Sequence, residues 1–326
     1  MSTEKTSRFL KQELPRWFLL IFTVLVAIVF FILEPAFFTG YNINNMFTTA
    51  AISGIMALGG MMAFGSGELN FGLGSIAAFS GTLLGLLTDR IGFGPALVVA
   101  LLGAILIGVI CSFFTFNLGL PSFVASLGIG KVFDGVSRFL CTNKSIYSDK
   151  WGPAFFWLGQ GRIGVVNVCI LLFAVIAVLM WFLTEKTPLG RHIFAVGDNM
   201  QACKQVGINV RRVKYISFIL SSFFGGLAGV LYVSQIGYVP VLPGSSMLMY
   251  AIAASMLGAT FLRPGRFNVP GVLLAAFLLS MIQNGIVNLG ISSSFTYIVQ
   301  GVILTISVSI IALVRKGGLP GVSFGN

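Results

Sequence analysis

Charged residues are scarce in this chain of 326 residues. Asp, Glu, Lys and Arg make up 9% of the sequence, whereas a soluble domain carries about 25%. A soluble fold of this length needs a large polar exterior, so the composition excludes one. The one histidine, His192, lies in a polar stretch and cannot supply a histidine-based triad or zinc site within the apolar segments. The four cysteines lack metal-type spacing, and we interpret them as unpaired.

The sequence also lacks a nucleotide-binding loop. The stretch LGIGKV (127–132) contains Gly-Lys, but Ala125 occupies the required first glycine position of a Walker A motif and Val132 its Ser/Thr position. The chain is therefore not an ATPase, and no catalytic set of residues appears elsewhere. We expect a protein that is not an enzyme and holds no cofactor or metal of its own.

Hydrophobic residues, by contrast, make up 56% of the chain and gather in long runs. A helix needs about 20 apolar residues to cross roughly 30 Å of hydrocarbon. The pattern predicts an all-α polytopic membrane protein with about ten transmembrane helices, forming a single domain over residues 1–326. The predicted spans are residues 17–33, 46–64, 72–88, 94–116, 123–141, 164–183, 215–235, 246–262, 270–289 and 295–314.

The basic residues between these runs predict the orientation and account for the net charge of +11 without nucleic acid. With a cytoplasmic amino terminus, fourteen of the twenty Lys and Arg lie inside and four outside, which is a strong positive-inside bias. Both termini are then cytoplasmic. The inner set is Lys5, Arg8, Lys11, Arg16, Lys186, Arg191, Lys204, Arg211, Arg212, Lys214, Arg263, Arg266, Arg315 and Lys316. The longest outer loop, 142–163, carries aromatics that form either an interfacial belt or a lid over a ligand: Trp151, Phe155, Phe156 and Trp157.

The cytoplasmic polar stretch 184–214 contains a signal for a short helix. Asp198 is a suitable N-cap, Gln201 completes a capping box, and Gly207 is a natural stop. The helix would carry one apolar stripe, made of Met200, Cys203 and Val206. Two turns are too short to be stable alone in water. The helix is therefore either a packed loop or a knob that binds a partner protein.

Polar residues inside predicted spans are candidates for a translocation path. Glu68 and Asn70 lie in GSGELNFGLGS, whose glycines would interrupt a helix in the core and let it line a cavity; a glycine-rich contact between helices is the alternative. In the ninth span, three residues could hydrogen-bond either a polyol or neighbouring helices: Gln283, Asn284 and Asn288. In the fifth span, three residues form either an ion-pair brace or a substrate site: Lys131, Asp134 and Arg138.

Several segments, in order along nearly the whole chain, resemble one family. TPLGRHIFAVGDNMQACKQVGINV is similar to the cytoplasmic loop of permease subunits of bacterial ABC importers of the ribose type. GELNFGLGSIAAFSG (67–81), which contains Ser75, resembles a second family segment, and YAIAASMLGATFLRPGRFNVPG (250–271) and NGIVNLGI (284–291) resemble two more. The loop residues that match are Thr187, Gly190, Arg191, Ala195, Gly197, Asn199, Ala202, Gly207 and Ile208.

This resemblance implies a permease in the bacterial inner membrane that imports a monosaccharide or related small polar solute. It implies three partners: an ATP-binding subunit that holds the ATP, an extracytoplasmic solute-binding protein, and a second permease copy. The short loop helix would couple the permease to the ATP-binding subunit. The coupling residues expected are Thr187, Gly190, Arg191, Gly197, Asp198, Asn199, Met200, Ala202, Cys203, Val206 and Gly207.

The same resemblance adds Ser75 to the candidates for the translocation path. A different class of function is a secondary transporter or channel driven by an ion gradient. Such proteins often use a carboxylate within the membrane, and Glu68 or Asp134 could serve.

Overall fold

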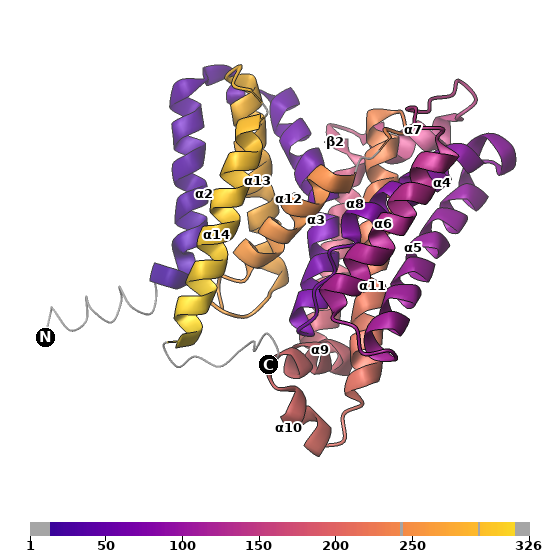
Figure 1. Ribbon diagram of the computed structural model, residues 1–326. Coiled ribbons are helices and arrows are strands. Elements are labelled where there is room, and N and C mark those ends of the chain that lie inside the picture. Colours follow the sequence, from indigo (N-terminus) through magenta and orange to yellow (C-terminus); the bar gives the residue numbers. More distant parts are fainter. Residues whose placement is uncertain (1–13, 242–243, 293, 317–326) are drawn as a thin grey trace, which may run out of the picture.

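The computed structural model describes residues 14–241, 244–292 and 294–316. Within these residues, ten long helices coincide with the ten predicted apolar segments (Figure 1). Lys5, Arg8 and Lys11, which were predicted to be cytoplasmic, lie outside the described residues. The helices are α2 (Leu14–Leu33), α3 (Gly40–Gly65), α4 (Leu73–Ile91), α5 (Phe93–Phe116), α6 (Ser122–Leu140), α8 (Val168–Lys186), α11 (Val210–Ile236), α12 (Gly244–Gly258), α13 (Val269–Asn288) and α14 (Ser294–Lys316).

Four of the predicted boundaries are wrong by four to six residues. Helix α3 begins at Gly40 instead of 46 and α11 at Val210 instead of 215, and two predicted segments extend past their helix. The sixth segment was expected from residue 164, but β1 (Arg162–Ile163) and β2 (Val166–Asn167) form a small hairpin there, and α8 begins only after Asn167 caps it. The eighth segment was expected to reach residue 262, but α12 ends at Gly258 and the chain turns through residues 259–268. In both places apolar residues continue beyond the helix, so hydropathy alone could not locate its end.

Five of the helices are long and apolar enough to cross a membrane: α3, α5, α8, α11 and α13. The chain is thus an all-α membrane protein in its architecture, apart from the two-residue strands. The hydrophobic side chains on the outside of α2, α5 and α8 agree with this, because an apolar exterior is stable only against lipid or another protein. The count of ten spans remains a prediction.

Helices α3 and α11 form the centre of the bundle. Residues 50–65 of α3 are all buried, and α11 packs against α3, α4 and α5. At Gly229 of α11, an added Cβ would lie 2.1 Å from the carbonyl oxygen of Ala77 on α4, so these two backbones are in direct contact. Small residues that permit such an approach are typical of helix packing in membranes. Figure 1 shows α2, α13 and α14 on one side of this centre and α4, α5 and α6 on the other.

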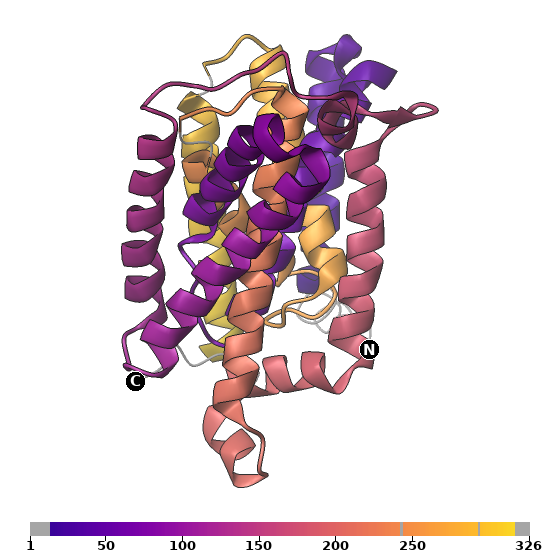
Figure 2. The ribbon, with the colours of Figure 1, turned by 90° about the vertical axis from the view of Figure 1, so that its right-hand side faces the viewer.

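Two short helices, α9 (Pro188–Asp198) and α10 (Met200–Gln205), project from one end of the bundle (Figure 2). We call this the loop end. Figure 1 shows that α2 begins and α14 finishes at the same end. This arrangement agrees with the predicted topology, in which the termini and the stretch 184–214 share one side.

The outer-loop aromatics lie at the opposite end, where α7 (Pro153–Gln160) is found. Trp151 and Phe155 are buried in a hydrophobic cluster, and the indole N–H of Trp151 donates to the carbonyl oxygen of Gly85, 2.9 Å away. Phe156 is half-buried, and Trp157 alone of the four is largely exposed. Trp151 and Phe155 therefore pack the loop against the bundle, and Trp157 is the aromatic residue positioned to contact the membrane interface.

Candidate functional site

The loop at the loop end consists of two capped helices rather than one. Thr187 caps α9, accepting a hydrogen bond from the backbone N–H of Gly190, and Pro188 occupies the first helical turn. Asn199 caps α10 by accepting from the N–H of Ala202, 2.9 Å away. The prediction that Asp198 is the cap is wrong by one residue. Asp198 still belongs to α9, and only Asn199 has the extended backbone that a cap requires.

The predicted stop of α10 is confirmed, but its apolar stripe is divided between two faces. Gly207 follows the helix with φ +81°, a conformation that favours glycine. Cys203 is buried in the main hydrophobic core, and Met200 packs against that core. Val206 instead is 74% exposed, and Ala202, one turn before it, is exposed too. Met200 and Cys203 therefore attach α10 to the bundle, while Ala202 and Val206 present an outward apolar face.

Helix α9 lies directly under the end of α3. Ile193, Phe194 and Val196 are buried there, whereas Arg191 is exposed. At Gly197 an added Cβ would lie 2.2 Å from the carbonyl oxygen of Gly65, so a side chain at this position would push α9 away from α3. The backbones of α9 and of the end of α3 are therefore in direct contact.

The chain between α3 and α4, residues 66–72, is non-helical and forms a junction with two other helices. Its first link goes to the start of α11, where the Lys214 ammonium lies 2.5 Å from the Glu68 carboxylate and both side chains are mostly buried. Ser217 also donates to Ser66, at 2.8 Å. The Asn70 side chain is fully buried and donates to Ser221, at 3.2 Å.

The second link of this junction goes to α6. The backbone N–H of Leu69 donates to the Ser122 hydroxyl, and that of Phe71 donates to the Ser126 hydroxyl, each at 3.1 Å. Ser126 in turn donates to the carbonyl oxygen of Leu69. Residues 66–72 therefore connect α11 to α6 through hydrogen bonds and an ion pair. Helix α11 directly follows the loop that contains α9 and α10. Glu68 and Asn70, predicted to line a path, have protein partners here.

A cavity of about 330 Å³ lies among α3, α11, α12, α13 and α14. Gln283, one of the predicted path residues, lines it. Gln283 was predicted because it is a glutamine within a predicted span. The other polar residues that line the cavity were not predicted. The polar lining comprises Thr49, Ser53, Tyr232, Gln235, Tyr250, Gln283, Thr296, Tyr297 and Gln300.

The remaining predicted path residues lie elsewhere. Asn284 accepts hydrogen bonds from Asn42 on α3, at 2.8 Å, and from Asn288, at 2.9 Å. Asn284 therefore bonds a neighbouring helix, which was the alternative, whereas the bond of Asn288 stays within α13. Ser75 lines a second, smaller cavity of about 200 Å³ between α4, α6 and α12, together with Asp134 and Lys131. The Lys131 ammonium lies 3.0 Å from the Asp134 carboxylate, as the ion-pair interpretation expected.

Comparison with known proteins identifies the family. Residues 42–308 match the family described as the permease component of the branched-chain amino acid transport system. The chain belongs to this permease family. Its ABC permease relatives include the probable ABC transporter permease protein YphD of Escherichia coli (strain K12), 32% identical over 92% of this chain and 90% of the relative. No solved structure matches the chain.

Two further relatives bear names that state a cargo. The ribose import permease protein RbsC of Escherichia coli (strain K12) is 29% identical over 87% of this chain and 89% of its own length. The autoinducer 2 import system permease protein LsrC of Salmonella paratyphi B is 30% identical over 86% of this chain and 83% of its own. The permease is thus the membrane component of an ABC importer, as the resemblance implied.

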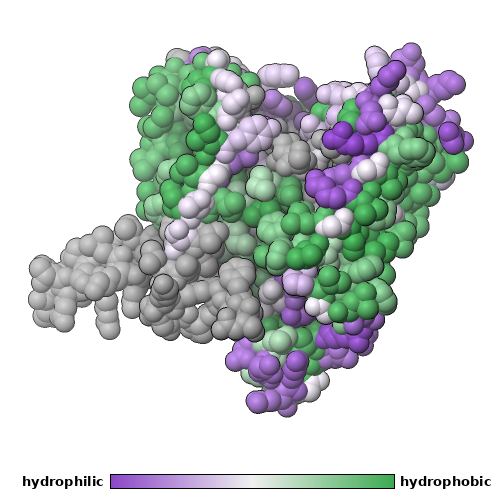
Figure 3. Space-filling model, viewed as in Figure 1, coloured by the Kyte–Doolittle hydropathy of each residue, from purple (hydrophilic) through white to green (hydrophobic). Residues whose placement is uncertain are grey.

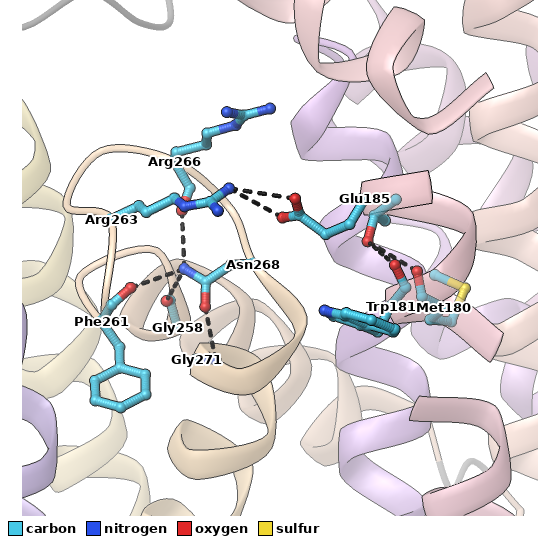
Figure 4. A network of polar contacts seen from close by, with 10 residues as sticks. Met180, Trp181, Glu185, Gly258, Phe261, Arg263, Arg266, Asn268 and Gly271 are labelled. Atoms are coloured by element: carbon cyan, nitrogen blue, oxygen red, sulfur yellow. Dashed lines mark hydrogen bonds and ion pairs between the residues drawn. The ribbon is translucent and has the colours of Figure 1, made fainter. Parts of the chain in front are cut away.

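The turn between α12 and α13 of the permease also reaches the loop end. Figure 4 shows the Asn268 side chain at the centre of this turn. Its amide donates to the carbonyl oxygens of Phe261, at 2.8 Å, and Arg266, at 3.1 Å, while its own oxygen caps α13 by accepting from Gly271. Arg263 extends from the same turn to Glu185 near the end of α8, at 3.1 Å.

Replacing Asn268 with alanine is expected to destabilise the permease by about 2–3 kcal/mol, because it removes a helix cap and leaves buried carbonyl groups unpaired. Thermal unfolding of the purified protein in detergent, followed by circular dichroism, measures the change. Arg263→Ala is the matched control from the same turn. Its ion pair is about half exposed to solvent, so it should change stability by less than about 1 kcal/mol. Equal effects of the two variants would show that Asn268 does not hold the turn.

Proposed function

We propose that this permease subunit moves a monosaccharide or a related small polar solute into the cell, driven by ATP hydrolysis on a separate subunit. The relatives named for ribose and autoinducer 2 import support this cargo class. The observation that carries the mechanism is the outward apolar face of α10, where Val206 is 74% exposed at the loop end. None of the residues that the structure describes covers that valine, and an ATP-binding subunit is the partner that an ABC permease requires.

In this proposal the loop end is cytoplasmic, and α10 acts as the coupling helix. The basic residues Lys204, Arg211 and Arg212 are exposed around it, as the positive-inside rule expects of a cytoplasmic loop. Movement of the ATP-binding subunit would pass from α10 to α9, and from α9 through Gly197 to the end of α3. The junction at residues 66–72 would carry the same movement to α6.

A second permease copy would face α6. The Lys131 side chain is 76% exposed near the middle of this helix, although it is paired with Asp134. Figure 3 shows hydrophilic residues where α6 runs, on a face that is otherwise mainly hydrophobic. A charge at that depth is costly against lipid, so it faces either water or protein. We therefore place the central path and the second copy on the side of α6, with the solute-binding protein at the opposite end from α10.

The proposal places the protein in the bacterial inner membrane with ten spans and no enzymatic activity. An ion-driven transporter is the other class that the sequence allowed. It would need a carboxylate free to exchange its ion, but Glu68 pairs with Lys214 and Asp134 pairs with Lys131. These partners favour the ATP-driven importer, because each carboxylate already has its compensating charge.

Reconstitution tests the proposal directly. Proteoliposomes with the permease, its ATP-binding subunit and the cognate solute-binding protein should accumulate labelled D-ribose or another neutral monosaccharide only while ATP is hydrolysed. A variant ATP-binding subunit that cannot hydrolyse ATP is the control and should abolish accumulation. Uptake that continues without hydrolysis and collapses with the proton gradient would contradict the proposal and support the ion-driven class.

A further inference from the structure

Two buried polar atoms on α14 have no hydrogen-bond partner among the residues that the structure describes. They are the side-chain hydroxyl oxygen of Thr296 and the amide oxygen Oε1 of Gln300. The two residues are only 7% and 8% exposed. They are four positions apart on one helix, so they share a face, and both line the cavity of about 330 Å³.

Such atoms are unusual, because a buried polar group without a partner is energetically costly. Neither residue is needed to bond another helix, and an apolar side chain would fill either position at no such cost. The presence of both polar groups on one cavity wall is explained if a bound ligand forms hydrogen bonds with them. The volume lies at the lower end of the roughly 300–1,000 Å³ typical of small-molecule sites.

The rest of the lining indicates the kind of ligand. Its polar side chains are hydroxyls, phenols and amides, among them Ser53, Tyr232 and Gln235, and no Asp, Glu, Lys or Arg is found among the lining residues that the structure describes. An amino acid would bring a carboxylate and an ammonium group into this site without a counter-charge, which is strongly unfavourable. An uncharged solute with several hydroxyl groups meets no such penalty and can donate to the oxygens of Thr296 and Gln300.

We propose that this cavity is a binding site for an uncharged polyhydroxylated solute within a single subunit, with Thr296 and Gln300 bonding its hydroxyl groups. The inference rests on the proposed import of a small polar solute and specifies its chemical class and two of its contacts.

The test uses the complete importer in proteoliposomes with labelled D-ribose, D-galactose and L-leucine. We expect ATP-dependent uptake of a sugar but not of leucine. Thr296→Val and Gln300→Leu should each lower sugar uptake at least about tenfold, because each removes a hydrogen bond to the solute. The unfolding temperature of either variant should not fall, since Thr296 Oγ1 and Gln300 Oε1 bond no other group in the described part of the chain.

Thr115→Val on α5 is the matched control. The Thr115 hydroxyl is also buried and has no partner among the described residues, but it does not line the cavity. Uptake by this variant should therefore equal that of the wild type. Undiminished sugar uptake in both α14 variants, a lowered unfolding temperature in them, or an equal loss in Thr115→Val would each overturn the inference alone. A wild-type importer that moves leucine but no sugar, or none of the three compounds, would contradict the proposed function as well.

Discussion

Replacing Lys214 with glutamate is expected to lower solute uptake at least about tenfold, because it places two carboxylates together in a mostly buried position. The Glu68 and Lys214 side chains are only 12% and 16% exposed, so water cannot effectively screen the repulsion. The pair joins the start of α11 to residues 66–72, which in turn bond α6. We expect the ATP-binding subunit still to bind, because α10 is unchanged. We also expect that ATP hydrolysis no longer drives transport.

The double variant Glu68→Lys, Lys214→Glu restores opposite charges and should recover most of the uptake. Uptake and ATP hydrolysis are measured together in proteoliposomes, and Lys150→Glu, an exposed site at the opposite end, serves as the control for charge alone. If the double variant forms a folded complex but solute uptake does not recover, attraction between the charges at positions 68 and 214 is not what couples α11 to residues 66–72.

The partner of Glu68 could not be predicted from the sequence. Local reasoning recognised a carboxylate in a glycine-rich stretch between the predicted spans 46–64 and 72–88, and made it a candidate for a translocation path. The structure shows α3 ending at Gly65, before this residue, and the compensating charge is 146 positions away in the chain. A contact at that separation depends on how α3 and α11 pack, and no local pattern specifies it.

The helices themselves were largely predictable, since an apolar run of sufficient length is stable in lipid only as a helix. The short loop helix shows where this reasoning stops. Its existence and its glycine stop followed from capping rules, but the cap was misplaced because Asp198 and Asn199 are adjacent and both residue types cap well. Only the presence of α9, which ends at Asp198, decides between them.

The division of the apolar residues of α10 has a similar cause. Met200, Cys203 and Val206 are spaced as one helical stripe, but a helix of six residues has too few positions to define a face by periodicity. Which side turns inward is decided by the core beneath, where Cys203 is buried. In the cavity, Gln300 lies within a predicted span and could have been noted by the rule that found Gln283. The hydroxyl of Thr296 could not, because threonine is common in such helices.

Introducing aspartate at both Ala202 and Val206 is expected to abolish recruitment of the ATP-binding subunit. Ala202 lies on α10 and Val206 directly follows its last residue; both are exposed, one turn apart, and form the outward apolar face of the loop end. A charge buried in such a contact should weaken binding by at least about thirtyfold, corresponding to the roughly 2 kcal/mol of an interface hot spot. Co-purification of the two subunits and ATP-driven uptake measure the loss.

The variant also separates docking from folding. Because neither side chain contacts the core, the unfolding temperature of the isolated permease should not change. Met200→Ala provides the contrast from the same helix: Met200 packs against the core, so its truncation should lower the unfolding temperature and weaken recruitment less. Tyr147→Asp, an exposed site at the opposite end, should alter neither property. An Ala202→Asp, Val206→Asp permease that still binds its ATP-binding subunit at wild-type strength would show that the force enters through another surface, and the route from α10 through Gly197 to α3 would then have no role in transport.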